Sequence, residues 1–99
     1  MFNPGDQVVA KIRISKYGRR SCGYACTVIR QTKPDRVMVV TNQAFGVDGG
    51  CLKVAEVSTG LVERVPWQRI SPEALVWLRK FYSNNHAGVL DKLHGIKDQ

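Results

Sequence analysis

The sequence predicts a small α+β domain in which five short antiparallel β-strands form a barrel and a helical segment follows. Apolar and polar residues alternate in short stretches separated by turn residues, which is typical of a β-unit. Ser71 and Pro72 then begin a stretch with helical periodicity. A chain of 99 residues forms one modest core. We therefore expect residues 1–99 to be one domain, with a barrel over 4–70, a helical appendage over 71–95 and a frayed tail over 96–99.

Three strands are expected in the first part of the chain, over 7–14, 24–31 and 36–41. In the first, apolar residues at even positions face the core, and mostly polar residues at odd positions, from Gln7 onward, face outward. The second has apolar residues on both faces, which indicates a central position in the sheet. Between these two strands, residues 15–23 hold two glycines and three basic residues, as expected of a hairpin loop in water.

Two further strands that complete the barrel, and then a helix, are expected in the rest of the chain. Residues 51–57 and 61–65 are expected to pair as a second hairpin through the turn residues 58–60. Ser71 is the expected N-cap of the helix, and Pro72 takes its first position. We expect the helix to lie across the barrel through Trp77 and Phe81. Its apolar face comprises Ala74, Leu75, Trp77, Leu78, Phe81 and Tyr82, and a short second helix is expected over 86–94.

The net charge of +7 is concentrated at the start of the chain. Residues 1–36 contain eight basic and two acidic residues, whereas 37–70 are balanced. Such clustering attracts polyanions or an acidic protein patch, and it also occurs on faces that are merely solvated. The candidate binding residues are Lys11, Arg13, Lys16, Tyr17, Arg19, Arg20, Arg30 and Arg36.

These candidates have distinct expected roles. Lys11, Arg13, Arg19 and Arg20 would neutralise phosphates, and Tyr17 would stack on a base. An equally open interpretation is that Tyr17 covers the edge of the barrel and contacts no ligand.

No constellation in the sequence predicts an enzyme, a metal or a cofactor. Carboxylates are scattered, no phosphate-binding loop is present, and both histidines fall in the C-terminal segment. The spacing of Cys22 and Cys26 fits zinc chelation, but a strand would separate them by about 13 Å. We expect three reduced thiols without a metal.

The chain is expected to remain in the cytoplasm. Its longest uncharged apolar runs are far shorter than the ~20 residues of a membrane span, and a leader is missing from the N-terminus. Edge strands in a small barrel pair readily between copies, so we expect a monomer or a weak homodimer.

The successive segments PGDQVVAK, YACTVI, RVMVVT and LVERVPWQRI resemble those of small SH3-like barrels, particularly the Tudor and KOW branches. The resemblance covers about residues 4–70. The Tudor branch implies an aromatic cage for methylated Lys or Arg, for which this chain offers Tyr24 and Phe45. The KOW branch implies contacts with RNA, DNA or polymerase through loops, which suits the basic loop better.

These observations favour a non-enzymatic binding module that contacts nucleic acid, DNA or RNA, through its basic loop. The alternative is a small regulatory or inhibitory protein, of the kind that phages and mobile elements encode, which docks on an acidic surface of a larger host complex. In that case a second partner face is expected on the exposed side of the helix, at Val76, Arg79 and Lys80.

Overall fold

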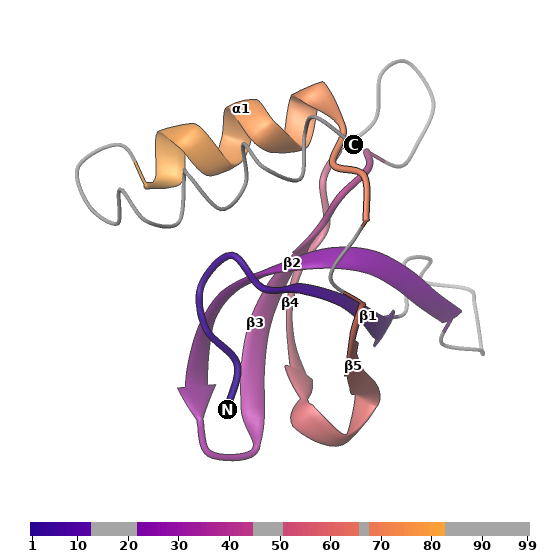
Figure 1. Ribbon diagram of the computed structural model, residues 1–99, viewed down its shortest axis with the longest axis vertical. Helices are drawn as coiled ribbons and strands as arrows, with labels where there is room; N and C mark the ends of the chain where they lie inside the picture. The colour runs from indigo at the N-terminus through magenta and orange to yellow at the C-terminus, as the bar shows by residue number, and fades with distance from the viewer. Residues whose placement is uncertain (13–21, 45–50, 66–67, 83–99) are drawn as a thin grey trace.

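The computed structural model describes residues 1–12, 22–44, 51–65 and 68–82. They form an antiparallel five-stranded sheet and one α-helix, so the predicted α+β class is confirmed (Figure 1). The second helix expected over 86–94 lies outside the described residues. The elements are β1 (Gln7–Ile12), β2 (Cys22–Lys33), β3 (Arg36–Thr41), β4 (Val54–Ser58), the 3-10 turn η1 (Thr59–Leu61), β5 (Val62–Arg64) and α1 (Pro72–Phe81).

The strand order in the sheet is β4-β3-β2-β1-β5. The predicted second hairpin is therefore wrong, because β4 pairs with β3 and β5 pairs with β1. The 3-10 turn η1 connects β4 and β5, which stand at opposite ends of the strand order. The fourth strand also begins later than expected, at Val54 rather than Cys51.

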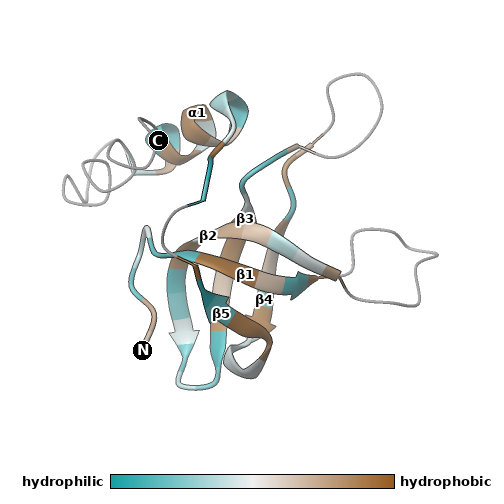
Figure 2. Cartoon of the chain, turned by 45° about the vertical axis from the view of Figure 1, so that its right-hand side comes forward, coloured by the Kyte–Doolittle hydropathy of each residue, from teal (hydrophilic) through white to brown (hydrophobic). Residues whose placement is uncertain are grey.

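The central position predicted for β2 is confirmed, since β1 and β3 pair with its two edges. Its alternate residues contribute to two hydrophobic clusters on opposite faces of the sheet. The inner cluster contains Val8, Ala10, Ile12, Cys26, Val28, Val37, Val39 and Val57. The outer cluster, beneath α1, contains Ile29, Val40, Ile70, Ala74, Leu75, Leu78 and Tyr82. Figure 2 shows the apolar stretches of the strands giving way to hydrophilic residues at the β2–β3 turn.

A β-bulge in β2 directs residues toward the helix. The ladder with β3 pairs Val28 with Val39 and Arg30 with Met38, so Ile29 is the extra residue between them. The Ile29 side chain is buried in the outer cluster, and its carbonyl oxygen accepts a 2.6 Å hydrogen bond from the Tyr82 hydroxyl. The bulge thus fixes where α1 contacts the sheet.

The helix begins as the sequence predicts, and most of its predicted apolar face packs on the sheet. The Ser71 hydroxyl accepts a 3.2 Å bond from the Ala74 backbone N–H, with Pro72 at the first position. The expected contact is confirmed for Trp77, which is half-buried and packs against the outer cluster, but it is wrong for Phe81, which is 52% exposed. Their rings stack on each other on the flank of the helix, with centroids 5.3 Å apart.

A buried polar triad lies between the sheet and the start of the helix. Gln7, expected to face water, is 4% exposed, and its Nε2 donates to Thr27 Oγ1 at 2.8 Å. The Thr27 hydroxyl donates to Asn42 Oδ1 at 2.6 Å, and Asn42 Nδ2 donates back to Gln7 Oε1 at 2.8 Å. The closed ring satisfies each buried side chain, which removes the main cost of placing amides in a core.

The N-terminal residues pack against the end of β5. A turn precedes β1, with the Asp6 backbone N–H donating to the Asn3 carbonyl and Gly5 at φ 88°. The Arg64 guanidinium carbon lies 4.5 Å from the centroid of the Phe2 ring, and Arg64 Nε lies 3.7 Å from Asp6 Oδ2.

In the described part of the chain, no helix has the length and apolar character that crossing a membrane requires.

Candidate functional site

The basic segment predicted to bind is connected to two neighbouring strand ends. Ile12 and Cys22 are register partners at the end of the β1–β2 pair, so residues 13–21 leave and re-enter the sheet at adjacent points (Figure 1). Five candidate residues, Arg13, Lys16, Tyr17, Arg19 and Arg20, lie in this segment, outside the described residues. The described candidate nearest to them in sequence is Lys11, which is exposed on β1 opposite Gly23.

The two remaining candidates, Arg30 and Arg36, lie far from Lys11. Arg30 lies seven positions along β2 from Gly23, the partner of Lys11, which corresponds to roughly 23 Å of extended strand. Arg30 and Arg36 are both exposed close to the β2–β3 turn, where Lys33 pairs with Arg36. The described basic residues of the first half thus form two groups rather than one continuous face.

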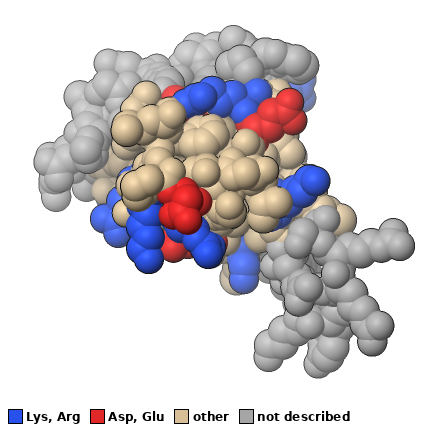
Figure 3. Space-filling model, turned by 90° about the horizontal axis from the view of Figure 1, so that it is seen from below, with Lys and Arg blue, Asp and Glu red and all other residues tan. Residues whose placement is uncertain are grey.

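The group near the β2–β3 turn is electrostatically mixed. Asp35 lies within the turn, and Glu56 on β4 pairs with Met38, which is the register partner of Arg30. Figure 3, which views this end of the molecule, shows acidic side chains among the lysines and arginines. Opposite charges at this spacing weaken the attraction for a polyanion. Lys11 and the segment that follows it are therefore the stronger part of the candidate site.

A shallow pocket of about 230 Å³ lies beside Lys11 on the outer side of β1 and β5. The ladder explains its shape, because side chains of paired residues project from the same face. Val9 pairs with Ala25 on one side and with Glu63 on the other, while Lys11 pairs with Gly23. Small residues on β2 thus leave space next to the longer side chains of β1. The lining residues are Val9, Lys11, Gly23, Gly60, Leu61, Val62 and Glu63.

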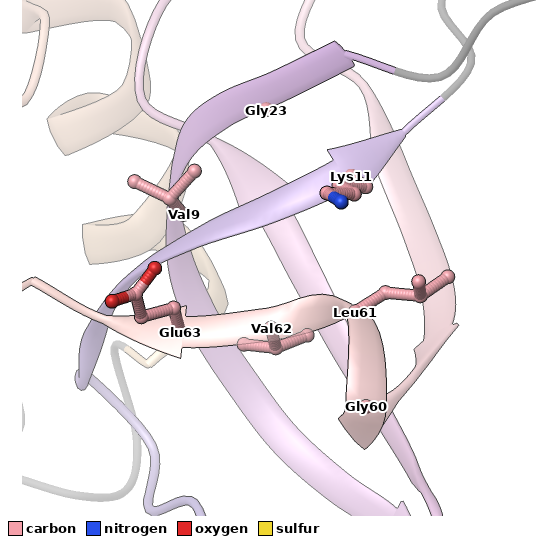
Figure 4. Close-up of a pocket in the computed structure, with 7 residues that line it drawn as sticks. All are labelled: Val9, Lys11, Gly23, Gly60, Leu61, Val62 and Glu63. Carbon is pink, nitrogen blue, oxygen red and sulfur yellow. The ribbon is translucent and has the colours of Figure 1, made fainter.

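Opposite charges stand at opposite ends of this pocket. Figure 4 shows the Glu63 carboxylate beside Val9 and the Lys11 side chain at the other end, with Leu61 on the rim. Among the described residues, neither Lys11 nor Glu63 forms an ion pair or a side-chain hydrogen bond with the other. Both side chains are exposed, and Leu61 is 45% exposed. A ligand with both a negative group and a hydrogen-bond donor fits this arrangement.

Gly23 is required for the pocket to keep its shape. A Cβ atom built on Gly23 would lie 2.9 Å from Cγ1 of Val9, closer than carbon atoms approach without displacement. Any larger residue there would force Val9 or the backbone of β2 to shift. The sequence pattern predicts Gly23 in the loop and Leu61 in a strand, whereas Gly23 lies in β2 and Leu61 in η1. Glu63 is one of the acidic residues that balance the charge of residues 37–70. Glu63 and Leu61 lie beside β1 because β5 pairs with β1, and the local sequence pattern does not reveal this pairing.

The helix residues expected to form a second partner face do lie together. Val76 is 50% exposed, and Arg79 and Lys80, three and four residues further along α1, are exposed on the same side. None of these three residues lines the pocket beside Lys11.

Cys26 has the environment of a structural thiol, because it is buried, whereas Cys22 and Cys51 are exposed. Cys22 and Cys26 both lie in the extended strand β2, so about 13 Å of backbone separates them and they cannot chelate one ion together. Burial raises the pKa of the Cys26 thiol to about 12, and a hydrogen bond with the backbone of Ala10 partly opposes that rise. Cys26 is therefore protonated at neutral pH. Within the described ranges, no three His, Cys, Asp or Glu side chains cluster as metal ligands.

Comparison of the chain with models of protein families, with curated proteins and with solved structures finds no match, so the pocket beside Lys11 and the basic segment that follows it are interpreted from their own chemistry.

Proposed function

We propose that this chain is a non-enzymatic binding module that contacts nucleic acid through residues 13–21 together with Lys11. The observation that carries the proposal is the pairing of Ile12 with Cys22, which presents both ends of the most basic segment at one end of the sheet. Phosphate neutralisation by clustered Lys and Arg needs no catalytic group. Tyr17 supplies the stacking contact that single-stranded nucleic acid accepts from aromatic residues.

The double substitution Arg19→Glu, Arg20→Glu tests this proposal. We expect it to weaken binding to a fluorescent single-stranded oligonucleotide and to flatten the dependence of log K on log salt. Each lost phosphate contact reduces the slope by about 0.7–0.9. The matched control is Arg79→Glu, Lys80→Glu, which makes the same change in net charge on the helix. Equal affinities for the wild type and the Arg19, Arg20 variant would contradict the proposal.

A second candidate function is that of a small regulatory or inhibitory protein, of phage or mobile-element type, that docks on an acidic surface of a larger complex. The observation that favours it is the exposure of Val76 and Phe81 on α1 beside Arg79 and Lys80. Pull-down from nuclease-treated lysate separates the two functions. One stoichiometric protein, lost on Arg79→Glu, Lys80→Glu, supports docking. Disappearance of all partners after nuclease treatment supports nucleic-acid binding.

We also infer that the sheet closes as an SH3-like barrel and that the protein works in the cytoplasm. The barrel inference is supported by the inner cluster, in which Val8, Val28 and Val57 from three strands pack together and Val62 of β5 joins them. It is further supported by η1, which turns the chain directly from one end of the strand order to the other.

A further inference from the structure

The pocket beside Lys11 is the right size for one ring of a nucleic acid and has a charge pattern that orients a nucleotide. Its volume of about 230 Å³ is below the range of roughly 300–1,000 Å³ in sites that enclose drug-sized ligands. A single unstacked base therefore fits better than a dinucleotide. The pocket also lies where β1 leads into residues 13–21, the segment proposed to contact the backbone.

The two charged residues would place the two parts of a nucleotide differently. Lys11 attracts a phosphate, whereas the Glu63 carboxylate repels one. A bound nucleotide thus has its phosphate at the Lys11 end and its base at the Glu63 end. Val9, beside Glu63, then offers an apolar contact to the base, and Leu61, at the Lys11 end, offers one to the sugar.

Glu63 also selects among bases by hydrogen bonding. An ionised carboxylate only accepts hydrogen bonds, and it pairs well with the exocyclic N4 amino group of cytosine. Thymine and uracil have an acceptor oxygen at the same ring position, which would face the carboxylate unfavourably. We propose that this pocket binds one unstacked cytosine of a single strand, with Glu63 accepting from its amino group and Lys11 contacting its phosphate. The proposal rests on the nucleic-acid function proposed above.

The test compares the affinity of the full chain for two short oligonucleotides, dC8 and dT8, at pH 8 and low salt. The wild type should bind dC8 at least about fivefold more tightly, which is the lower end of what one good base contact provides. Glu63→Gln should bring the two affinities close together, because an amide both accepts and donates and so tolerates either base. Removal of the negative charge should also strengthen binding to both oligonucleotides.

The matched control is Glu56→Gln, which makes the same charge change at an exposed position of β4, outside the pocket. It should keep the preference for dC8. Leu61→Ala should weaken binding to dC8 by more than Val54→Ala, a truncation of an exposed residue on β4. These exposed substitutions leave the core intact, so folding is not at issue.

The outcomes distinguish the two proposals. Salt-dependent binding with equal affinity for dC8 and dT8 in the wild type would overturn the pocket assignment and leave the basic segment as the binding site. A preference for dC8 that survives Glu63→Gln would overturn it as well. No binding of either oligonucleotide would overturn both this inference and the nucleic-acid function on which it rests.

Discussion

At the scale of single residues, Tyr82 links the helix to the irregularity in β2. Ile29 is the extra residue at the β-bulge between Val28 and Arg30. The Tyr82 hydroxyl donates to the Ile29 carbonyl at 2.6 Å, and burial raises the pKa of Tyr82 to about 12. Burial also raises the pKa of Cys26 to about 12. Both groups hold their protons more tightly in the folded chain than in the unfolded one.

This difference predicts a loss of stability at alkaline pH. The ordinary pKa values are 9.0 for the Cys26 thiol and 10.0 for the Tyr82 hydroxyl. Above them the unfolded chain releases protons that the folded chain retains, so the free energy of unfolding falls as pH rises from about 9 toward 12. Urea unfolding at pH 7, 9, 10 and 11 should show this decline.

The substitution Tyr82→Phe measures how much the Tyr82 hydroxyl contributes to the loss of stability at alkaline pH. It should cost about 1 kcal/mol at pH 7, because the Ile29 carbonyl loses its partner. It should also lose less stability than the wild type between pH 10 and 11. Val76→Ala, on the exposed side of the helix, should retain the wild-type pH profile. A Tyr82→Phe profile parallel to that of the wild type would mean that this hydroxyl does not contribute.

At the scale of elements, the two helical segments differ in how they begin. The Ser71 hydroxyl caps α1 by accepting from the Ala74 N–H, whereas Ser58, at the same position before η1, forms no side-chain cap bond. Ser71→Ala should therefore reduce the free energy of unfolding by about 1 kcal/mol, and Ser58→Ala should leave it nearly unchanged. Urea unfolding followed by circular dichroism measures both. Equal losses would show that the Ser71 hydroxyl has no specific role.

The elements that the sequence predicted well are those defined by local pattern. Strand β3 matches its expected bounds, β2 is central, and α1 begins at its predicted cap because N-cap and proline preferences act within one turn. The prediction of a β4–β5 hairpin was wrong. It rested on the short distance between the two strands in the sequence, whereas β5 pairs with β1, more than fifty residues earlier. The role of Phe81 was misjudged because both flanks of an apolar helix face look alike on a wheel.

The candidate site was predictable to a smaller extent. Lys11 and the segment after it are predictable from the sequence, because the clustering of basic residues is visible there. The same clustering includes Arg30 and Arg36, although the length of β2 keeps these two residues at the other end of the sheet. Gly23 and Glu63 had no local signal, since their proximity to Lys11 arises from the register of three strands.

At the scale of the whole molecule, the buried triad connects the parts that the two hydrophobic clusters stabilise separately. Gln7 belongs to β1 and Thr27 to β2, and Asn42 follows β3. The Asn42 backbone N–H donates to the Ala25 carbonyl, and its own carbonyl accepts from the Ser71 N–H at 2.8 Å, directly before α1. Replacement of Asn42 should therefore destabilise the packing on both faces of the sheet.

Asn42→Ala should lower the free energy of unfolding of the whole domain by roughly 2–3 kcal/mol, since it leaves two buried polar groups without partners. Gln43→Ala, at the exposed neighbouring position, should have little effect.

The double variant Thr27→Val, Asn42→Ala should lose less free energy of unfolding than the sum of the two single variants, because residues of one network couple by about 0.5–3 kcal/mol. Additive losses would show that the ring does not act as a unit. Coincident unfolding followed by tryptophan fluorescence, which reports on Trp67 and Trp77, and by far-ultraviolet circular dichroism would show that the domain unfolds as one unit.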